Sequence, residues 1–215
     1  MNLSIATIVI IAANVLVSIK GFNDFSFFER YKFNIGAIRR GEHIRALTSG
    51  FLHVDFTHLL FNMLTLYFFA PIVVRHFGDP KFLVIYFVSL LTGSLLSLNF
   101  HKEEYHYSAV GASGAVTGVL YAAILLQPGM RLAFFFIPIP IPAYIFGIGY
   151  LLYSIYGMKA RIGNIGHTAH FGGAIGGYVM TLIFSPSLVT QEPLMVALLA
   201  IPIIVLFILE KTGKI

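Results

Sequence analysis

The residues of this sequence best suited to chemistry are a serine and a histidine, each set among glycines in an apolar segment. Ser113 lies in GASGAVTG, residues 111–118, and His170 lies in GHTAHFGGAIGGY, residues 166–178. A serine hydroxyl is a weak nucleophile until an adjacent base removes its proton, and histidine is the commonest such base. The pair therefore predicts nucleophilic catalysis, provided that the two segments lie side by side.

Both segments carry small residues at the spacing that lets membrane helices approach closely. The set consists of Gly111, Gly114 and Gly118 around Ser113, and of Gly173 and Gly177 after His170. Packing of these faces would bring Ser113 within hydrogen-bonding reach of His170. No Asp or Glu lies in either segment or in residues 56–75, so the sequence offers a Ser-His dyad and no triad with a carboxylate.

A third apolar segment supplies polar side chains that suit an oxyanion site. His58 and Asn62 are four residues apart in HLLFN and would share one face of a helix. Attack by Ser113 creates an oxyanion, which the Asn62 amide, the His58 imidazole and the Ser113 backbone N–H could stabilise by roughly 3 to 4 kcal/mol per donor.

Two other interpretations stay open at this level. The glycines around Ser113 also fit helix packing with no catalysis. His53 with His58, or His167 with His170, also suits a metal site, although Asp55 is the only carboxylate near these histidines and the H-E-x-x-H pattern is absent.

Composition places these residues in a membrane protein. Of 215 residues, 58% are hydrophobic and 11% are charged, and the mean hydropathy is +0.86. The net charge of +5 comes from scattered basic residues, which gives no support to nucleic-acid binding. Cysteine is absent, which excludes disulfides, thiolate metal sites and cysteine nucleophiles.

The elements that must position the site are spanning helices. A bilayer requires about 20 apolar residues per crossing, and the chain offers seven such stretches, near 2–19, 56–75, 81–99, 110–127, 132–154, 167–185 and 193–210. The first lacks a basic region before it and a cleavage site after it, so we expect an uncleaved helix. The seven stretches are long and lack the alternation of apolar and polar residues that strands show, which predicts an all-α polytopic fold.

Two stretches depart from this simple pattern. Residues 20–55 mix charges with aromatic residues and predict a structured loop at the membrane interface. In the fifth span, Pro138, Pro140 and Pro142 alternate in FIPIPIPAY, which predicts a kinked or locally unwound helix.

Taken together and in this order, the motifs resemble those of the rhomboid family of intramembrane serine proteases. HVDFTHLLFNM (53–63) is similar to the family's second-helix signature, GASG (111–114) to its nucleophile motif, and AHFGGAIGG (169–177) to its A-H-x-x-G-x-x-x-G. The resemblance implies Ser113 as nucleophile, His170 as general base, and an oxyanion hole of His58, Asn62 and the Ser113 amide. His53 occupies a further polar position of the signature.

The resemblance also implies an architecture and an activity. Residues 1–215 would form one membrane-embedded rhomboid domain, with a six-helix core over about 1–187 and an added span over about 193–210. Glu42 and Arg45 match a loop-stabilising acid and arginine. The family cleaves single-spanning membrane proteins in or near their transmembrane segments, without metal or cofactor.

The sequence departs from the family pattern at two positions, Ile44 in place of a common tryptophan and Thr117 in place of an aromatic residue. Thr117 leaves open what orients the catalytic histidine. The rival function is a catalytically silent member of the fold that binds transmembrane helices as a chaperone or trafficking factor. We expect a bacterial cytoplasmic membrane as the location, and the sequence leaves the oligomeric state undetermined.

Overall fold

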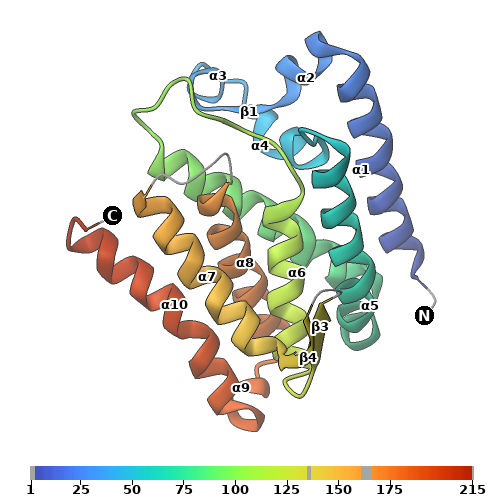
Figure 1. Cartoon of the computed structure of the whole chain (residues 1–215), viewed down its shortest axis with the longest axis vertical. Coiled ribbons are helices and arrows are strands. Elements are labelled where there is room, and N and C mark those ends of the chain that lie inside the picture. The colour runs from blue at the N-terminus through green and yellow to red at the C-terminus, as the bar shows by residue number, and fades with distance from the viewer. Residues whose placement is uncertain (1–2, 135–136, 161–165, 215) are drawn as a thin grey trace.

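The chain folds into a helical bundle. The computed structural model describes residues 3–134, 137–160 and 166–214, and these are almost entirely helical (Figure 1). The long helices are α1 (Ile5–Asn23), α5 (Phe56–Phe100), α6 (Ser113–Leu126), α7 (Ala143–Ala160), α8 (His167–Phe184) and α10 (Pro193–Lys211), with a short α9 (Leu188–Gln191) before the last.

Helix α5 contains two of the predicted spans, 56–75 and 81–99, joined directly at a break. Gly78 has φ 73°, a left-handed conformation that glycine adopts without steric penalty, and Pro80 follows it. Asp55 caps the start of α5, where its carboxylate accepts the backbone N–H of His58 at 2.7 Å. The connection between the two spans is therefore a sharp break between two abutting helices.

The predicted fifth span, 132–154, is wrong in its first part. Residues 131–134 and 137–142 form an antiparallel pair, β3 (Arg131–Phe134) and β4 (Ile137–Pro142), with Leu132 opposite Ile141, and helix α7 begins only at Ala143. Proline lacks a backbone donor and is tolerated on edge strands, where that position faces away from the ladder. Alternate prolines therefore suit a strand paired on one side better than a kinked helix, and the locally unwound alternative that we predicted is closer to what the structure shows.

The fold is that of a polytopic helical membrane protein. Among the described residues, α1, α5 and α10 are long and apolar enough to cross a bilayer, and α5 does so with two segments. Large apolar side chains point outward from these helices, including Ile5, Leu16, Leu194 and Phe207. Such a surface requires lipid rather than water around it.

The segment between α1 and α5 is structured, as predicted for residues 20–55. It contains α2 (Phe25–Tyr31), β1 (Phe33–Asn34), α3 (Ile35–Arg39), α4 (Arg45–Thr48) and the 3-10 turn η1 (Ser49–Phe51). These elements lie at one end of the bundle, whereas β3 and β4 lie at the opposite end (Figure 1). Strand β1 pairs with β2 (Ser108–Ala109), which leads into the start of α6.

Helices α5, α6 and α8 form the centre of the bundle and make the most extensive contacts with one another. The largest fully buried side chains lie mainly on these helices and include Tyr86, Tyr121, Phe82 and Phe171. Helix α1 packs on α5, and α10 packs on α7 at the outer side. The residues predicted to do chemistry thus lie on the innermost helices.

Candidate active site

Glycines bring α6 and α8 into backbone contact. A methyl group added at Gly173 would overlap the carbonyl oxygen of Gly114, and one added at Gly177 would overlap that of Gly118. This is the close approach that the spacing of small residues predicted. Gly111 differs, because it precedes α6 and does not belong to this contact.

Ser113 and His170 meet across the α6–α8 contact. Ser113 is the first residue of α6 and His170 lies in the first turn of α8. The Ser113 Oγ and His170 Nε2 are 2.7 Å apart, a hydrogen bond of ordinary length. His170 is only 7% exposed, whereas Ser113 is partly exposed. The arrangement has the geometry that activation of a serine requires.

His58 lies beside the loop that leads to Ser113. Gly111 has φ 125°, and a side-chain carbon built there would stand 2.8 Å from His58 Nε2 and 3.7 Å from Ser113 Oγ. Only glycine therefore fits between the imidazole and the serine. The structure thus places the His58 imidazole and the Ser113 hydroxyl on either side of Gly111, next to the N-terminus of α6.

Asn62 lies one turn beyond His58 and is 6% exposed. Its amide donates to the His58 carbonyl at 3.1 Å, which uses one of its two N–H bonds. The backbone N–H of Ser113, as the first of α6, has no acceptor within its own helix. Both groups thus keep a donor for a ligand.

His53 connects α1 to the loop before Ser113. Its Nε2 accepts the backbone N–H of Ala112 at 3.4 Å, and its Nδ1 is 2.8 Å from Ser18 Oγ. Ser18 itself donates to the Phe51 carbonyl at 3.0 Å, so its oxygen accepts from Nδ1–H. This network fixes the neutral tautomer of His53. Burial, helped by the nearby His58, lowers the pKa of His53 to about 3.

A small cavity of about 30 Å³ opens beside Ser113, which is room for ordered water. Its lining is mostly apolar, with Ser49, Ser94 and Ser97 among its residues and Gly111 and Gly114 forming part of its wall. Ser49 belongs to η1, and the two other serines belong to α5. The site therefore combines a partly exposed serine with a small recess beside it.

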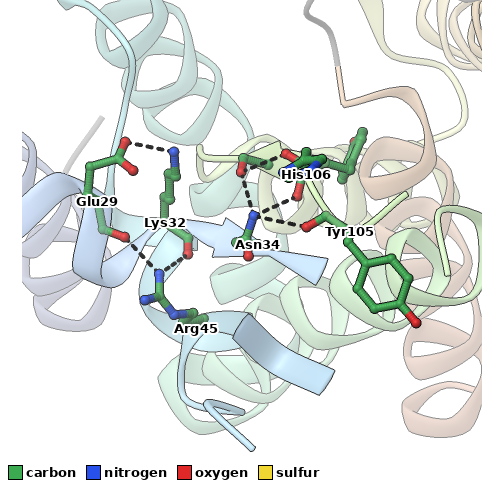
Figure 2. Close-up of polar contacts among 8 residues, drawn as sticks. Glu29, Lys32, Asn34, Arg45, Tyr105 and His106 are labelled. Atoms are coloured by element: carbon green, nitrogen blue, oxygen red, sulfur yellow. Dashed lines mark hydrogen bonds and ion pairs between the residues drawn. The ribbon is translucent and has the colours of Figure 1, made fainter. Parts of the chain in front are cut away.

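Arg45 and Glu42 contact each other in the segment between α1 and α5. Arg45 Nε donates to Glu42 Oε2 at 2.8 Å. Its Nη1 donates to the carbonyls of Glu29 and Lys32 at 2.8 and 3.0 Å (Figure 2). Arg45 is 9% exposed. One guanidinium thus joins α4 to the end of α2. Ile44, at the family's tryptophan position, is 59% exposed.

Asn34 fastens the same segment to the loop before α6. Its amide donates to the carbonyls of Tyr105 and Tyr107 at 3.4 and 3.3 Å (Figure 2). It also lies 3.1 Å from the Ser108 hydroxyl. These bonds reinforce the β1–β2 pairing and hold the end of the bundle that carries Ser113.

The histidines also form two aromatic contacts. The rings of His53 and His58 are 4.9 Å apart, edge to face, and those of His167 and His170 are 6.4 Å apart. In the described residues no group of three His, Cys, Asp or Glu side chains gathers at either place. His167 packs on Tyr153 with ring centroids 5.5 Å apart.

Sequence reasoning missed Tyr150 of α7. Its hydroxyl lies 2.7 Å from His170 Nδ1, and its ring stacks on the imidazole at 5.5 Å and 28°. Nothing local marks this tyrosine, because it lies among other tyrosines of an apolar helix, 20 residues before His170. The sequence-based prediction also missed Ser18, the partner of His53, because nothing local marks this serine either.

The bundle of spanning helices defines the class as a polytopic membrane protein, and at its centre a partly exposed serine is hydrogen-bonded to a buried histidine. Comparison with known proteins agrees with the membrane class. The family model of the rhomboid domain matches residues 40–187. The chain belongs to the rhomboid family.

Several curated relatives are similar over much of this chain. It is 30% identical over 182 residues to RHOMBOID-like protein 12, mitochondrial, of Arabidopsis thaliana, which covers 78% of this chain and 54% of that protein. It is 34% identical over 143 residues to Rhomboid protease GluP of Bacillus subtilis, which covers 66% of this chain and 26% of that protein. It is 30% identical over 152 residues to Rhomboid protein 1, mitochondrial, of Saccharomyces cerevisiae, which covers 69% of this chain and 44% of that protein. The chain thus spans about half or less of each relative's length.

Proposed function

We propose that this protein is an intramembrane serine endopeptidase that works by a Ser113–His170 dyad. The observation that carries the proposal is the 2.7 Å contact between Ser113 Oγ and His170 Nε2, held by glycine-mediated contact of α6 and α8. Membership of the rhomboid family, with a relative named as a protease, adds support.

In the first half of the proposed reaction, Ser113 Oγ attacks the carbonyl carbon of the scissile peptide bond while His170 Nε2 takes the hydroxyl proton. The C–O bond to Ser113 forms, and the carbonyl electrons move to the oxygen. His58, Asn62 and the Ser113 N–H would hold this oxyanion, at about 2.7 to 4 kcal/mol per donor. The C–N bond then breaks, His170 returns the proton to the leaving nitrogen, and an ester on Ser113 remains.

In the second half, a water molecule gives a proton to His170 and attacks the ester. The ester C–O bond breaks, the carboxylic product leaves, and Ser113 recovers its proton. The small cavity beside Ser113 has room for this water. The reaction so written needs no metal or cofactor.

The proposed substrates are single-spanning membrane proteins, cut in or near their transmembrane segments. A peptide bond within a helix is shielded from attack, so helix-destabilising residues near the cleavage site would make cleavage faster.

We further propose a six-helix core followed by α10 as one domain, in a bacterial cytoplasmic membrane. One of the similar proteins comes from a bacterium and another is named as mitochondrial. Separate import and fractionation assays in bacteria and in mitochondria would test the proposed location.

The test is cleavage of a tagged single-spanning reporter in proteoliposomes. We expect product from the wild type, with and without chelator, and none from Ser113→Ala or His170→Ala, each checked for folding. Absence of product from folded wild type over reporters with several different transmembrane sequences would favour the helix-binding alternative. Product that survives in Ser113→Ala would mean that the glycine-rich segment serves packing only.

A further inference from the structure

The unexplained feature of the site is the second nitrogen of His170. A neutral imidazole has one donor nitrogen and one acceptor nitrogen, and a general base must present the acceptor to the serine. Here Nε2 faces Ser113 Oγ at 2.7 Å, and Nδ1 faces the hydroxyl of Tyr150 at 2.7 Å. The position of the single imidazole proton therefore depends on which way the Tyr150 hydroxyl points.

The proposed chemistry sets that direction. For His170 to take the Ser113 proton, Nε2 must carry the lone pair, so the single imidazole proton belongs on Nδ1. The Tyr150 oxygen lies 2.7 Å from Nδ1 and can accept the hydrogen bond of that proton.

We propose that Tyr150 is the positioning residue that holds His170 in the tautomer whose Nε2 lone pair faces Ser113. The hydrogen bonds then run in one direction, from Ser113 Oγ to His170 Nε2 and from His170 Nδ1 to the Tyr150 oxygen. Tyr150 thus takes the place that a carboxylate has in a triad. This inference rests on the proposed protease function.

The helix that carries Tyr150 is well supported for this role. The Tyr121 hydroxyl of α6 donates to the Gly147 carbonyl of α7 at 2.9 Å, one turn before Tyr150. On its outer side α7 packs against α10, where Leu199 lies next to Gly147. Ring stacking between Tyr150 and His170 limits rotation of the imidazole. A positioning contact needs such supporting packing to be precise.

The first test reads the tautomer itself. In wild-type protein labelled with ¹⁵N-histidine and held in detergent micelles near neutral pH, nitrogen NMR distinguishes the protonated from the unprotonated nitrogen. The His170 signals are assigned from the spectrum of His170→Gln. We expect a protonated Nδ1 and an unprotonated Nε2. The opposite tautomer in the wild type would overturn the proposal, and this measurement does not depend on proteolytic activity.

The second test removes single hydroxyl groups and keeps the carbon frame. Tyr150→Phe should lower kcat for reporter cleavage about 10- to 100-fold, the range expected when a buried donor loses its acceptor, with KM within about twofold. Tyr156→Phe is the matched control, because Tyr156 is on the same helix and 59% exposed, and its activity should stay at the wild-type value.

The outcomes separate the two proposals. Equal kcat for folded Tyr150→Phe and Tyr156→Phe would overturn the positioning role while the protease stands. No cleavage by wild type, together with the expected tautomer, would remove the protease and keep the hydrogen-bond arrangement. If Tyr150→Phe does not fold, the wild-type NMR decides, and a protonated Nε2 with an unprotonated Nδ1 would overturn the positioning role.

Discussion

The sharpest consequence of the glycine-mediated contact concerns Gly173. Its alanine variant would place a methyl group on the Gly114 carbonyl oxygen, far inside the 3.4 Å at which ordinary contacts begin. Because backbone carbonyls of packed helices cannot turn aside, α6 and α8 must part by about 1 Å. Ser113 and His170 lie next to this contact, so their 2.7 Å separation would grow to about 3.7 Å.

The expected losses follow from that displacement. A misplacement of about 1 Å in a reacting pair lowers the rate by about 100-fold, and overpacking lowers the free energy of unfolding by about 1 to 3 kcal/mol. Gly114→Ala should have a milder effect, since its added carbon would stand 3.1 Å from the Ala169 carbonyl oxygen. Gly149→Ala is the control, because nothing lies within 4 Å of a carbon added there.

The assay compares kcat for reporter cleavage in proteoliposomes and the thermal midpoint in micelles for these three variants. We expect the order Gly149→Ala, Gly114→Ala, Gly173→Ala from most to least active. Activity of folded Gly173→Ala equal to that of Gly149→Ala would refute the claim that this contact sets the catalytic distance.

Two further predictions concern residues outside the spanning helices. Because the pKa of His53 falls from 6.5 to about 3 on folding, the unfolded chain binds a proton at His53 before the folded chain does as the pH is lowered. The contribution of His53 to the free energy of unfolding is complete above about pH 6.5 and declines by about 1.4 kcal/mol per pH unit toward pH 3. Thermal midpoints between pH 7 and 4 should therefore fall less steeply in His53→Gln, and parallel curves would contradict this. Arg45→Gln should lower the free energy of unfolding by about 2 to 4 kcal/mol, since it removes bonds to two carbonyls and a nearly buried charge. Glu42→Gln should cost less than about 1 kcal/mol, because its side chain is 47% exposed, and equal losses in chemical denaturation would contradict this difference.

Much of the helical framework could be predicted from the sequence, because spanning segments need a minimum apolar length that ordinary composition reveals. The contact of α6 with α8 could also be predicted, since glycine spacing determines how closely two membrane helices approach. The structure at the alternate prolines was harder to predict, because the same pattern disfavours a helix interior and suits an edge strand. We predicted a kinked or locally unwound helix where β4 pairs with β3.

The supporting contacts of the site could not be predicted, because they join residues far apart in the chain. Tyr150 is one of 11 tyrosines, and only the packing of α7 beside α8 turns it toward His170. Ser18 reaches His53 in the same way, from α1. Gly111 was predicted as a packing glycine, but a φ of 125° places it in the turn beside His58.

The most direct test of the central claim asks whether His170 activates Ser113. Wild-type protein in micelles is treated with a fluorophosphonate, and the modified residue and its rate of modification are measured by peptide mass spectrometry. We predict an adduct on Ser113 that forms at least about 100-fold more slowly in folded His170→Gln. An equal rate in that variant, or no adduct on Ser113 in folded wild type, would contradict the account.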